Sequence, residues 1–439
     1  MIKETKKLLT ISLLVSNRID TIRKCMESVK PLLEQLPSEL IVVDTVGEEN
    51  SDGSLAIAKE YATKVVHFDW CNDFAAARNA GLKEAQGAWF LFLDDDEWFE
   101  DVTPIINFFT SGEYEMYDCA GYYVRNYSNL EGTEYADAYV GRMVRLTKEH
   151  RFVGRIHEQV EPAGRVSKRL ECYVHHYGYV FQSKEAENKH FERNVSLLKE
   201  ELAKNPENLH AIAQLVQEYK VAGWFQEEKM LCEKTVSSYQ GNWESQLVQY
   251  LILNLATVGR RSGNGGEDEL TLVEQQYPMT GITKLACTIE HIIYAQLNKD
   301  WKQVLLYVKE FLRIRGEVQR NAEGYVIAEF MDAISEDKQQ EVILAGLRAM
   351  MACGQYEDAE ILFPLVNWKN DKVTPYEQLQ ILFSVYETTR NGSLMFRSLN
   401  GALENRKLHM AAQTLLNSYL AGYPERRPEV TRHMSGNFD

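Results

Sequence analysis

The sequence lacks the features of a membrane, secreted or nucleic-acid-binding protein. No apolar run in its 439 residues approaches the length needed to cross a bilayer. The seven cysteines are odd in number and form no Cys-x-x-Cys pair, so we expect buried thiols in a reducing compartment. Lys and Arg number 48 against 64 Asp and Glu, and the net charge of −16 argues against a nucleic-acid surface. We therefore expect a cytoplasmic protein with no nucleic-acid partner.

The composition is that of an ordinary globular protein, with 45% hydrophobic and 26% charged residues. The length is large for a single core and indicates two or three domains. Lys3, Lys6 and Lys7 precede an apolar run and imitate a secretory signal. That run is short, meets Asn17 at once and has no small-residue cleavage site after it. The pattern favours a first β-strand, Leu8–Val15.

The first hundred residues alternate strand and helix patterns. Short apolar runs mark the strands, and apolar residues three or four positions apart mark the helices. In chain order they are strand Leu8–Val15, helix Ile19–Leu33, strand Leu40–Val43, helix Ser54–Ala62, strand Val65–Phe68, helix Phe74–Gln86 and strand Trp89–Leu93. Such units predict a parallel sheet with helices on both faces. A mixed or antiparallel extension is predicted from shorter runs at Gly121–Asn126, Ala138–Leu146 and Cys172–His176.

After about Lys184 no convincing strand pattern remains. A helix–turn–helix is predicted, with the pattern of a degenerate tetratricopeptide repeat, from Asn205–Tyr219, Ala222–Phe225 and Glu227–Val236. Weaker matches to the same helix–turn–helix pattern have their turns at Asn298–Trp301 and Cys353–Ala359. The glycine-rich stretch Ser262–Gly266 lacks the Gly-Lys-Ser/Thr of a nucleotide loop, and we expect a turn between helices there. Residues 1–185 are therefore predicted to form an α/β domain, and residues 186–439 a stack of helical hairpins.

The apolar run that begins at Trp89 ends in three acids, Asp94, Asp95 and Asp96. Open α/β sheets bind ligands just beyond the carboxyl ends of their strands. Adjacent carboxylates raise one another's pKa unless a cation lies between them, and Mg²⁺ or Mn²⁺ bridging phosphates would supply that cation. The structural alternative is a helix N-cap with surplus acids in the first turn.

Other segments should reach the same sheet edge, because Asn17, Asp44 and Asp73 also follow predicted strands. A turn residue is the alternative for Asp44, and a helix N-cap for Asp73. Arg78 lies five residues into the next helix, where an exposed salt bridge is the alternative. Together these residues suit a nucleoside diphosphate, which needs acids for hydroxyls and base, an arginine for phosphate and a metal site. Trp70 is predicted either to stack on the base or sugar or to pack in the core.

Four elements in this order resemble the donor half of family 2 glycosyltransferases with the GT-A fold, over residues 8 to about 180: Ser12–Asn17, Ile41–Asp44, Asp73–Gly81 and Phe92–Asp96. The resemblance implies that Asp44 and Asp73 contact uridine or an equivalent nucleoside. It also implies that Asp94 meets the ribose or metal, and that Asp96 holds Mg²⁺ or Mn²⁺ on the diphosphate. The family pattern is broken at two places, Arg18, where many members have an acid, and Thr45–Gly47, which replaces an Asp-Gly-Ser run.

Two further stretches, Phe152–Val160 and His175–Tyr179, carry the sequences Gly-Arg-Ile-His-Glu and His-x-Gly-Tyr. They resemble a subset of family 2 enzymes that glycosylate bacterial surface glycans. They also resemble sublancin-type peptide S-glycosyltransferases, which join this domain to a helical, tetratricopeptide-like half. An inverting transfer needs a base opposite the departing diphosphate and an electrophile on it. Glu158 is the candidate base.

His157 is a candidate metal or phosphate partner, and a histidine satisfied by a backbone carbonyl is the alternative. His176 is predicted to be a third metal ligand or a packed histidine. Arg155 lies two residues before His157 on an expected strand, so both side chains would share a face and Arg155 would neutralise phosphate. The predicted donor-binding residues are Asn17, Asp44, Asp73, Arg78, Asp94, Asp95 and Arg155, and the predicted metal ligands are Asp94, Asp96 and His176.

The sequence thus predicts a metal-dependent inverting glycosyltransferase that moves a sugar from a nucleotide-sugar, above all a UDP-sugar, to a glycan, lipid-linked or peptide acceptor. One alternative is a peptide S- or O-glycosyltransferase for a bacteriocin-like peptide. Others are a non-catalytic helical scaffold and a nucleotidyltransferase, which would release pyrophosphate. Peripheral membrane contact stays open, since the basic clusters Arg165–Arg169 and Arg426–Arg427 also fit a solvated face. A homodimer through the helical half stays open as well.

Overall fold

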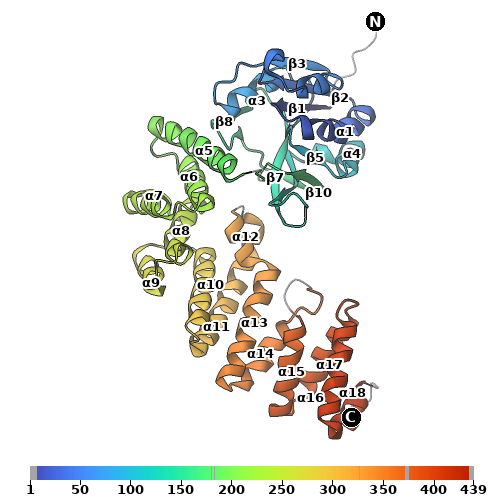
Figure 1. Ribbon diagram of the computed structural model, residues 1–439, viewed down its shortest axis with the longest axis vertical. Coiled ribbons are helices and arrows are strands. Elements are labelled where there is room, and N and C mark those ends of the chain that lie inside the picture. The colour runs from blue at the N-terminus through green and yellow to red at the C-terminus, as the bar shows by residue number, and fades with distance from the viewer. Residues whose placement is uncertain (1–6, 179, 182, 326, 371–374, 435–439) are drawn as a thin grey trace. The chain divides into compact units, whose positions relative to one another are not determined.

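The computed structural model describes residues 7–178, 180–181, 183–325, 327–370 and 375–434 (Figure 1). Lys3, Lys6 and Tyr179, which belong to the signal-like start and the His-x-Gly-Tyr motif, lie outside these residues. The chain divides into two compact units, Met1–Ala222 and Gly223–Asp439. The first unit contains the sheet, and every element assigned to the second is a helix. The predicted fold class, a GT-A-like mixed sheet followed by helices, is confirmed.

The first unit is built on an eight-stranded mixed sheet of order β3-β2-β1-β4-β7-β6-β10-β5. Its parallel half consists of β3 (Lys64–His67), β2 (Ser38–Asp44), β1 (Leu9–Val15) and β4 (Trp89–Asp94). The mixed half consists of β7 (Tyr135–Arg145), β6 (Cys119–Tyr127), β10 (Ser167–His176) and β5 (Glu97–Phe99). A separate hairpin pairs β8 (Arg151–Val153) with β9 (Gln159–Glu161).

The register of the parallel strands brings their polar ends together. Val15 of β1 pairs with Asp44, and Asp44 pairs with His67 on the other side. Leu14, one residue earlier on β1, pairs with Asp94. Strand β1 is buried along its whole length, including Thr10 and Ser12, which stand between its apolar residues. The carboxyl ends of β1, β2, β3 and β4 therefore share one edge, as the strand pattern predicts.

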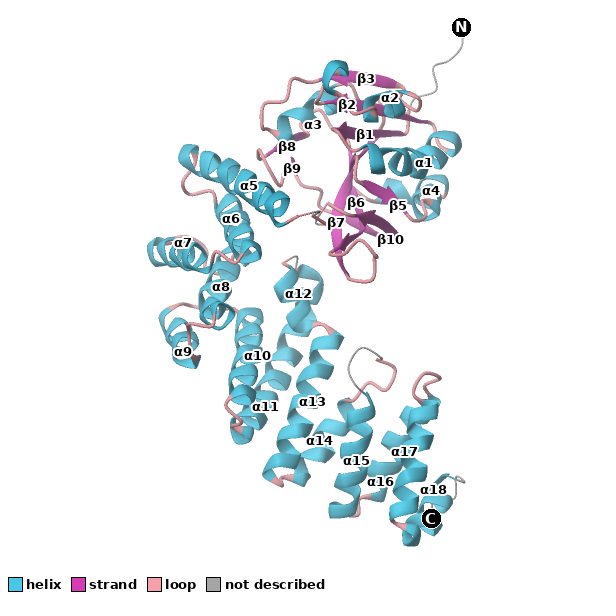
Figure 2. Ribbon diagram, viewed as in Figure 1, coloured by secondary structure: helices cyan, strands magenta, loops and turns pink. Residues whose placement is uncertain are grey.

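Helices cover both faces of this sheet (Figure 2). One face of β1 and β4 packs on α1 (Ile19–Gln35) and α4 (Thr103–Thr110), whereas the other meets α3 (Phe74–Lys83). The short α2 (Ser54–Lys59) follows the β2 loop. Gly81 of α3 lies so close to the strands that an added Cβ would be 2.5 Å from Ser12 Oγ and 2.9 Å from Val43. This glycine lets α3 approach the sheet and sets the position of its other side chains.

The first unit ends with the helices α5 (Lys184–Lys204) and α6 (Leu209–Ala222), which pack against each other. The sequence predicts a domain boundary at 185/186, where the strand patterns end, and the compact unit continues to Ala222. Side chains of this helix pair also contact the sheet domain. Glu200, His210 and Glu218 contact three residues of the β8–β9 segment. The end of the sheet and the end of the compact unit are thus different positions.

The second unit is a succession of helices packed on their neighbours, for example α7 on α8 and α10 on α11. They are α7 (Phe225–Ser238), α8 (Gln246–Ser262), α9 (Glu267–Gln276), α10 (Gly281–Leu297), α11 (Trp301–Val318), α12 (Ala328–Ile334), α13 (Glu336–Cys353), α14 (Ala359–Leu362), α15 (Pro375–Thr389), α16 (Gly392–Glu404), α17 (His409–Gly422) and α18 (Arg427–Met434). The turns predicted at Ser262–Gly266 and Asn298–Trp301 fall between helices. None of the helices in the described ranges is long and apolar enough to cross a membrane.

Candidate active site

The last residue of β4, Asp94, is held by two arginines. Its Oδ1 accepts a hydrogen bond from Arg78 Nη2 at 2.6 Å, and its Oδ2 lies 3.6 Å from Arg142 Nη1. Burial alone would raise the pKa of Asp94, but Arg78 and Arg142 outweigh it and lower the pKa to about 2. Asp94 is therefore an anion whose oxygens both face guanidinium groups.

Arg78, on α3, links Asp94 to Glu158. Its side chain is 4% exposed, Nη2 contacts Asp94, and Nε donates to Glu158 Oε1. Arg142, on β7, in turn donates from Nη2 to Glu97 Oε1 at 2.9 Å. The five side chains alternate in charge, which compensates the cost of burying each of them. The structure thus brings together the predicted Arg78, Asp94 and Glu158, and it adds Arg142 and Glu97, which the sequence did not predict.

Asp95 turns away from this network. Its Oδ2 accepts hydrogen bonds from Ser16 N at 2.6 Å and Ser16 Oγ at 2.9 Å, and Thr21 Oγ1 donates to its backbone carbonyl. Burial and the neighbouring charge of Asp96 raise the pKa of Asp95 to about 7. In this structure Asp95 ties the β4 turn to the β1–α1 segment.

Asp96 lies between a cation and a histidine. Its Oδ2 is 3.3 Å from Arg18 Nη2 and its Oδ1 is 3.8 Å from His176 Nε2. The other ring nitrogen of His176 lies 2.7 Å from Asn126 Oδ1. Asp96 and His176 are thus adjacent, whereas the third predicted ligand, Asp94, faces Arg78 and Arg142. The role of these residues as metal ligands stays a prediction. Within the described part of the chain, no group of three or more His, Cys, Asp or Glu is placed to hold a metal ion.

The side chains near Asp96 fit a divalent cation that takes only part of its ligands from the protein. Mg²⁺ is usually bound by one or two protein groups together with substrate phosphates, rather than by a complete protein cage. Asp96 supplies a hard oxygen, and His176 an imidazole nitrogen, which suits Mn²⁺ better than Mg²⁺. The remaining ligands would come from a diphosphate and water.

Asp44 lies at the end of β2 on the wall of a cavity of about 650 Å³. Its Oδ1 accepts hydrogen bonds from the amides of Val46 and Gly47 at 3.0 and 2.8 Å, and its Oδ2 lies 3.0 Å from His67 Nδ1. Burial would raise the pKa of Asp44, but the bonds from the two amides and His67 lower it. The same cavity is lined by Trp70, which is 38% exposed and has its ring edge-on to Phe74.

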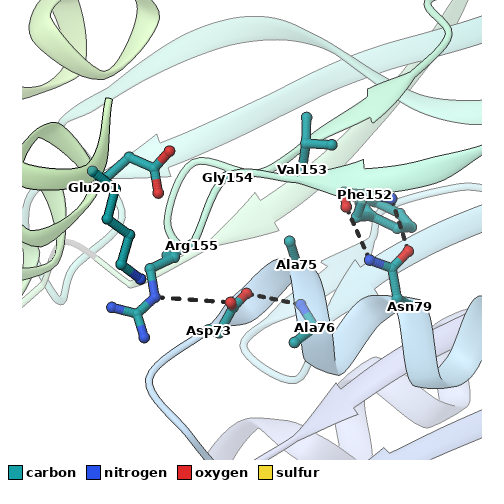
Figure 3. Close-up of a pocket in the computed structure, with 10 residues that line it drawn as sticks. Asp73, Ala75, Ala76, Asn79, Phe152, Val153, Gly154, Arg155 and Glu201 are labelled. Atoms are coloured by element: carbon teal, nitrogen blue, oxygen red, sulfur yellow. Dashed lines mark hydrogen bonds and ion pairs between the residues drawn. The ribbon is translucent and has the colours of Figure 1, made fainter. Parts of the chain in front are cut away.

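Asp73 caps α3, because its Oδ1 accepts a hydrogen bond from Ala76 N at 2.8 Å (Figure 3). Its Oδ2 lies 3.8 Å from Arg155 Nε. Both residues line a second cavity, of about 370 Å³, between α3, the β8 end and α5. Asn17 instead lies in a loop-to-loop contact: its Nδ2 donates to Asn50 O and its Oδ1 accepts from Asp52 N. The structure therefore does not place Asn17 or Asp73 in the Asp94 network.

The motif around His157 is not the strand expected from the sequence. Residues 154–158 form a loop between β8 and β9, and His157 has a φ of +52°. The prediction that Arg155 and His157 share one strand face is therefore wrong. Their side chains diverge: Arg155 pairs with Glu200, whereas His157 Nε2 lies 3.0 Å from Glu218 Oε1. The cause is the left-handed backbone at this position, which a strand cannot contain.

Residues 10–163 match the family model described as Glycosyl transferase family 2. This segment is a glycosyltransferase family 2 domain. It contains every strand-end acid described above, and of the predicted site residues only His176 lies outside it. The glycosyltransferase resemblance inferred from the sequence is thereby confirmed.

Several proteins are similar to parts of the chain. A TPR repeat-containing protein of Synechococcus elongatus is 26% identical over 267 residues, which cover 58% of this chain and 62% of that protein. The putative glycosyltransferase EpsH of Bacillus subtilis is 35% identical over 97 residues, covering 20% of this chain and 27% of EpsH. The chain thus spans less than two thirds of the length of either relative.

Among solved structures, TarS 1-349 of S. aureus in complex with UDP-GlcNAc is similar, with 13% sequence identity and a TM-score of 0.32. The likeness covers 61% of this chain and 90% of that one.

Proposed function

We propose that this chain is a glycosyltransferase that takes a sugar from a nucleoside diphosphate donor. The observation that carries the proposal is the family 2 match over residues 10–163, supported by the strand register that brings Asp44 and Asp94 to one sheet edge, with Asp96 two residues beyond the end of β4. That edge is where open α/β sheets bind ligands.

The nucleoside is assigned to the cavity beside Asp44, and UDP-sugars are the first donors to test. The walls of this cavity contain the Asp44 carboxylate, which can accept a hydrogen bond from a base N–H or a ribose hydroxyl. They also contain the partly exposed ring of Trp70, on which a base can stack. The diphosphate is assigned to the neighbourhood of Asp96, where Arg18 supplies a cationic group.

Asp96 and His176 are the residues that would hold Mg²⁺ or Mn²⁺. A divalent cation at this position would neutralise the charge that develops on the departing diphosphate. Arg78 and Arg142 hold Asp94 as an anion, ready to accept hydrogen bonds from sugar hydroxyls.

Glu158 stays the predicted general base of the inverting transfer. Its carboxylate is bound by Arg78, so it has a second possible role, which is to position that arginine. The variant Glu158→Gln separates the two. A base would lose most of kcat, typically 10²–10⁴-fold, with donor affinity unchanged, whereas a positioning group would also weaken donor binding. Glu161→Gln, at an exposed acid of the same hairpin, is the control.

The proposal is tested with the purified full chain and a panel of nucleotide-sugars, with and without Mn²⁺. The correct donor should raise the melting temperature by mass action, and turnover should release a nucleoside diphosphate. Release of pyrophosphate would instead identify a nucleotidyltransferase, and no binding or release with any donor would favour the non-catalytic scaffold.

The metal assignment is tested by Asp96→Asn. Removing the carboxylate should abolish Mn²⁺-dependent turnover and weaken Mn²⁺ binding in the presence of the nucleotide. Asp101→Asn, at an acid that accepts a hydrogen bond from Thr103 N at the start of α4, controls for the loss of one negative charge. Equal activity of the two variants would reject the metal site. The acceptor, whether glycan, lipid-linked or peptide, and the cytoplasmic location remain predictions from the sequence.

A further inference from the structure

Glu218 of α6 is a buried acid outside the donor site. Its side chain is 7% exposed. Oε1 accepts a hydrogen bond from Asn194 Nδ2 at 3.0 Å and lies 3.0 Å from His157 Nε2. Oε2 is buried and has no hydrogen-bond partner among the described residues. Burying a carboxylate with one oxygen unsatisfied is costly, and such groups are retained where they serve function or specificity.

The residue that Glu218 contacts has an unusual backbone. His157 has a φ of +52°, in the left-handed region that residues with a Cβ rarely adopt. Such a conformation persists only where the surroundings enforce it. Here α5 and α6 contact the loop on both sides of His157, through Glu200 to Arg155 and through His210 to Gln159.

The loop leads directly into the donor site. Glu158 follows His157 in the chain and accepts the hydrogen bond from Arg78 Nε. Arg78 then donates to Asp94 at 2.6 Å. Because Arg78 is almost completely buried, a displacement of Glu158 would leave a buried guanidinium half paired, and the orientation of Asp94 would change with it.

We propose that Glu218 is a positioning residue for the donor site. Through His157 it holds the loop 154–158 so that Glu158 engages Arg78 and Arg78 engages Asp94. The helix pair α5–α6 is then a part of the catalytic unit and not only a start of the helical half. The effect on donor binding rests on the proposed function, whereas the effect on the loop does not.

The test uses the full chain and compares Glu218→Leu with Glu218→Gln. Leucine removes the accepting oxygen, while glutamine keeps an oxygen that accepts from His157 and Asn194. Glu192→Gln is the matched control, because Glu192 is an exposed acid of the same helix pair, on α5. Circular dichroism verifies that each variant is folded. Hydrogen exchange is followed in peptides that cover residues 151–161 and 74–96, and binding of UDP with MnCl₂ is measured by calorimetry.

We expect Glu218→Leu to increase exchange in both peptides and to weaken UDP binding about tenfold or more, with Glu218→Gln and Glu192→Gln close to the wild type. Unchanged exchange in a folded Glu218→Leu variant would overturn the proposal. If the wild type binds neither UDP nor any other nucleotide, the proposed function fails, and the exchange comparison still decides whether Glu218 positions the loop.

Discussion

At the scale of single residues, the candidate site depends on buried charges that neutralise one another. Arg78 is the clearest case, since it lies between Asp94 and Glu158 with a side chain that is 4% exposed. Removing one member of such a group leaves the others buried and unpaired, which costs more than the group gains from being assembled.

Arg78→Leu should therefore lower the free energy of unfolding by about 3 kcal/mol or more. Urea denaturation followed by circular dichroism measures the change. Arg151→Leu is the control, because Arg151 pairs with Glu161 at the surface, where both side chains are at least half exposed, and should cost less than about 1 kcal/mol. Similar losses in the two variants would contradict the buried network.

Some of these residues could be predicted from the sequence, and others could not. Asp44 and Asp94 were predictable, because each directly follows a short apolar run, which is typical of a buried strand. Arg142 was not, since it meets Asp94 only because β7 pairs antiparallel with β4. Glu97 lies three residues after Asp94 and its Oε2 accepts a hydrogen bond from Asp94 N, but its pairing with Arg142 depends on β7 as well. A signal existed: Arg142 is a charged residue within an apolar stretch, and such a residue is buried only with a partner. The partner's identity depends on the register, which the pattern does not encode.

At the scale of elements, α3 connects the sheet to the site because it packs unusually close to β1 and β2. The Asn-Ala-Gly sequence at its centre belongs to the family resemblance, and the structure gives the reason for its glycine. The predicted helix ended at Gln86, three residues after the observed end at Lys83, whereas the small strand β5 and the hairpin β8–β9 were missed. Three-residue strands are too short to show a period.

Gly81→Val should destabilise the first unit by about 1–3 kcal/mol, because the new side chain must displace Ser12 or Val43. Donor binding should fall with it, since α3 also carries Asp73 and Arg78. The control is Gly141→Ala on β7, where an added Cβ meets nothing within 4 Å. Thermal unfolding of both variants measures the effect, and a neutral Gly81→Val would show that the packing relaxes freely.

The second unit contains a buried histidine that joins three helices. His291 of α10 lies 2.7 Å from Glu267 and 3.0 Å from Glu274, both on α9, and its ring stacks on Tyr307 of α11. Burial alone would lower the pKa of His291, but the two carboxylates outweigh it and raise the pKa. A raised pKa means that the folded state binds the proton more tightly than the unfolded state does.

The stabilisation from His291 should therefore be complete below about pH 6.5 and should be lost as the pH rises through the raised pKa. Urea denaturation of the wild type and His291→Gln between pH 5.5 and 8.5 measures the difference. The difference in the free energy of unfolding between the wild type and His291→Gln should shrink with increasing pH. In the variant Glu274→Gln the free energy of unfolding should depend less steeply on pH than in the wild type. A difference that grows with pH would reverse the assigned sign.

At the scale of the whole molecule, the change from sheet to helix near Lys184 was visible in the sequence, but the compact unit that ends at Ala222 was not. Hydrophobic periodicity identifies helices without saying what they pack against. The contacts that attach α5 and α6 to the sheet domain are polar pairs between distant residues.

A chain of residues 1–222 should fold cooperatively by itself. A chain of residues 1–185 lacks the partners of Arg155, His157 and Gln159 and should melt at least about 4 °C lower. Calorimetry of both chains provides the comparison, and equal melting temperatures would mean that the helix pair contributes nothing to the unit.

The position of this boundary also limits how the protein can be recombined. If the helical half is exchanged for that of a related protein, a junction at the last strand would separate His157 from Glu218 and pair it with a foreign helix. A junction between Ala222 and Gly223 would keep that pair intact. Among hybrids, those joined at the later position should be the ones that keep the donor half of the reaction.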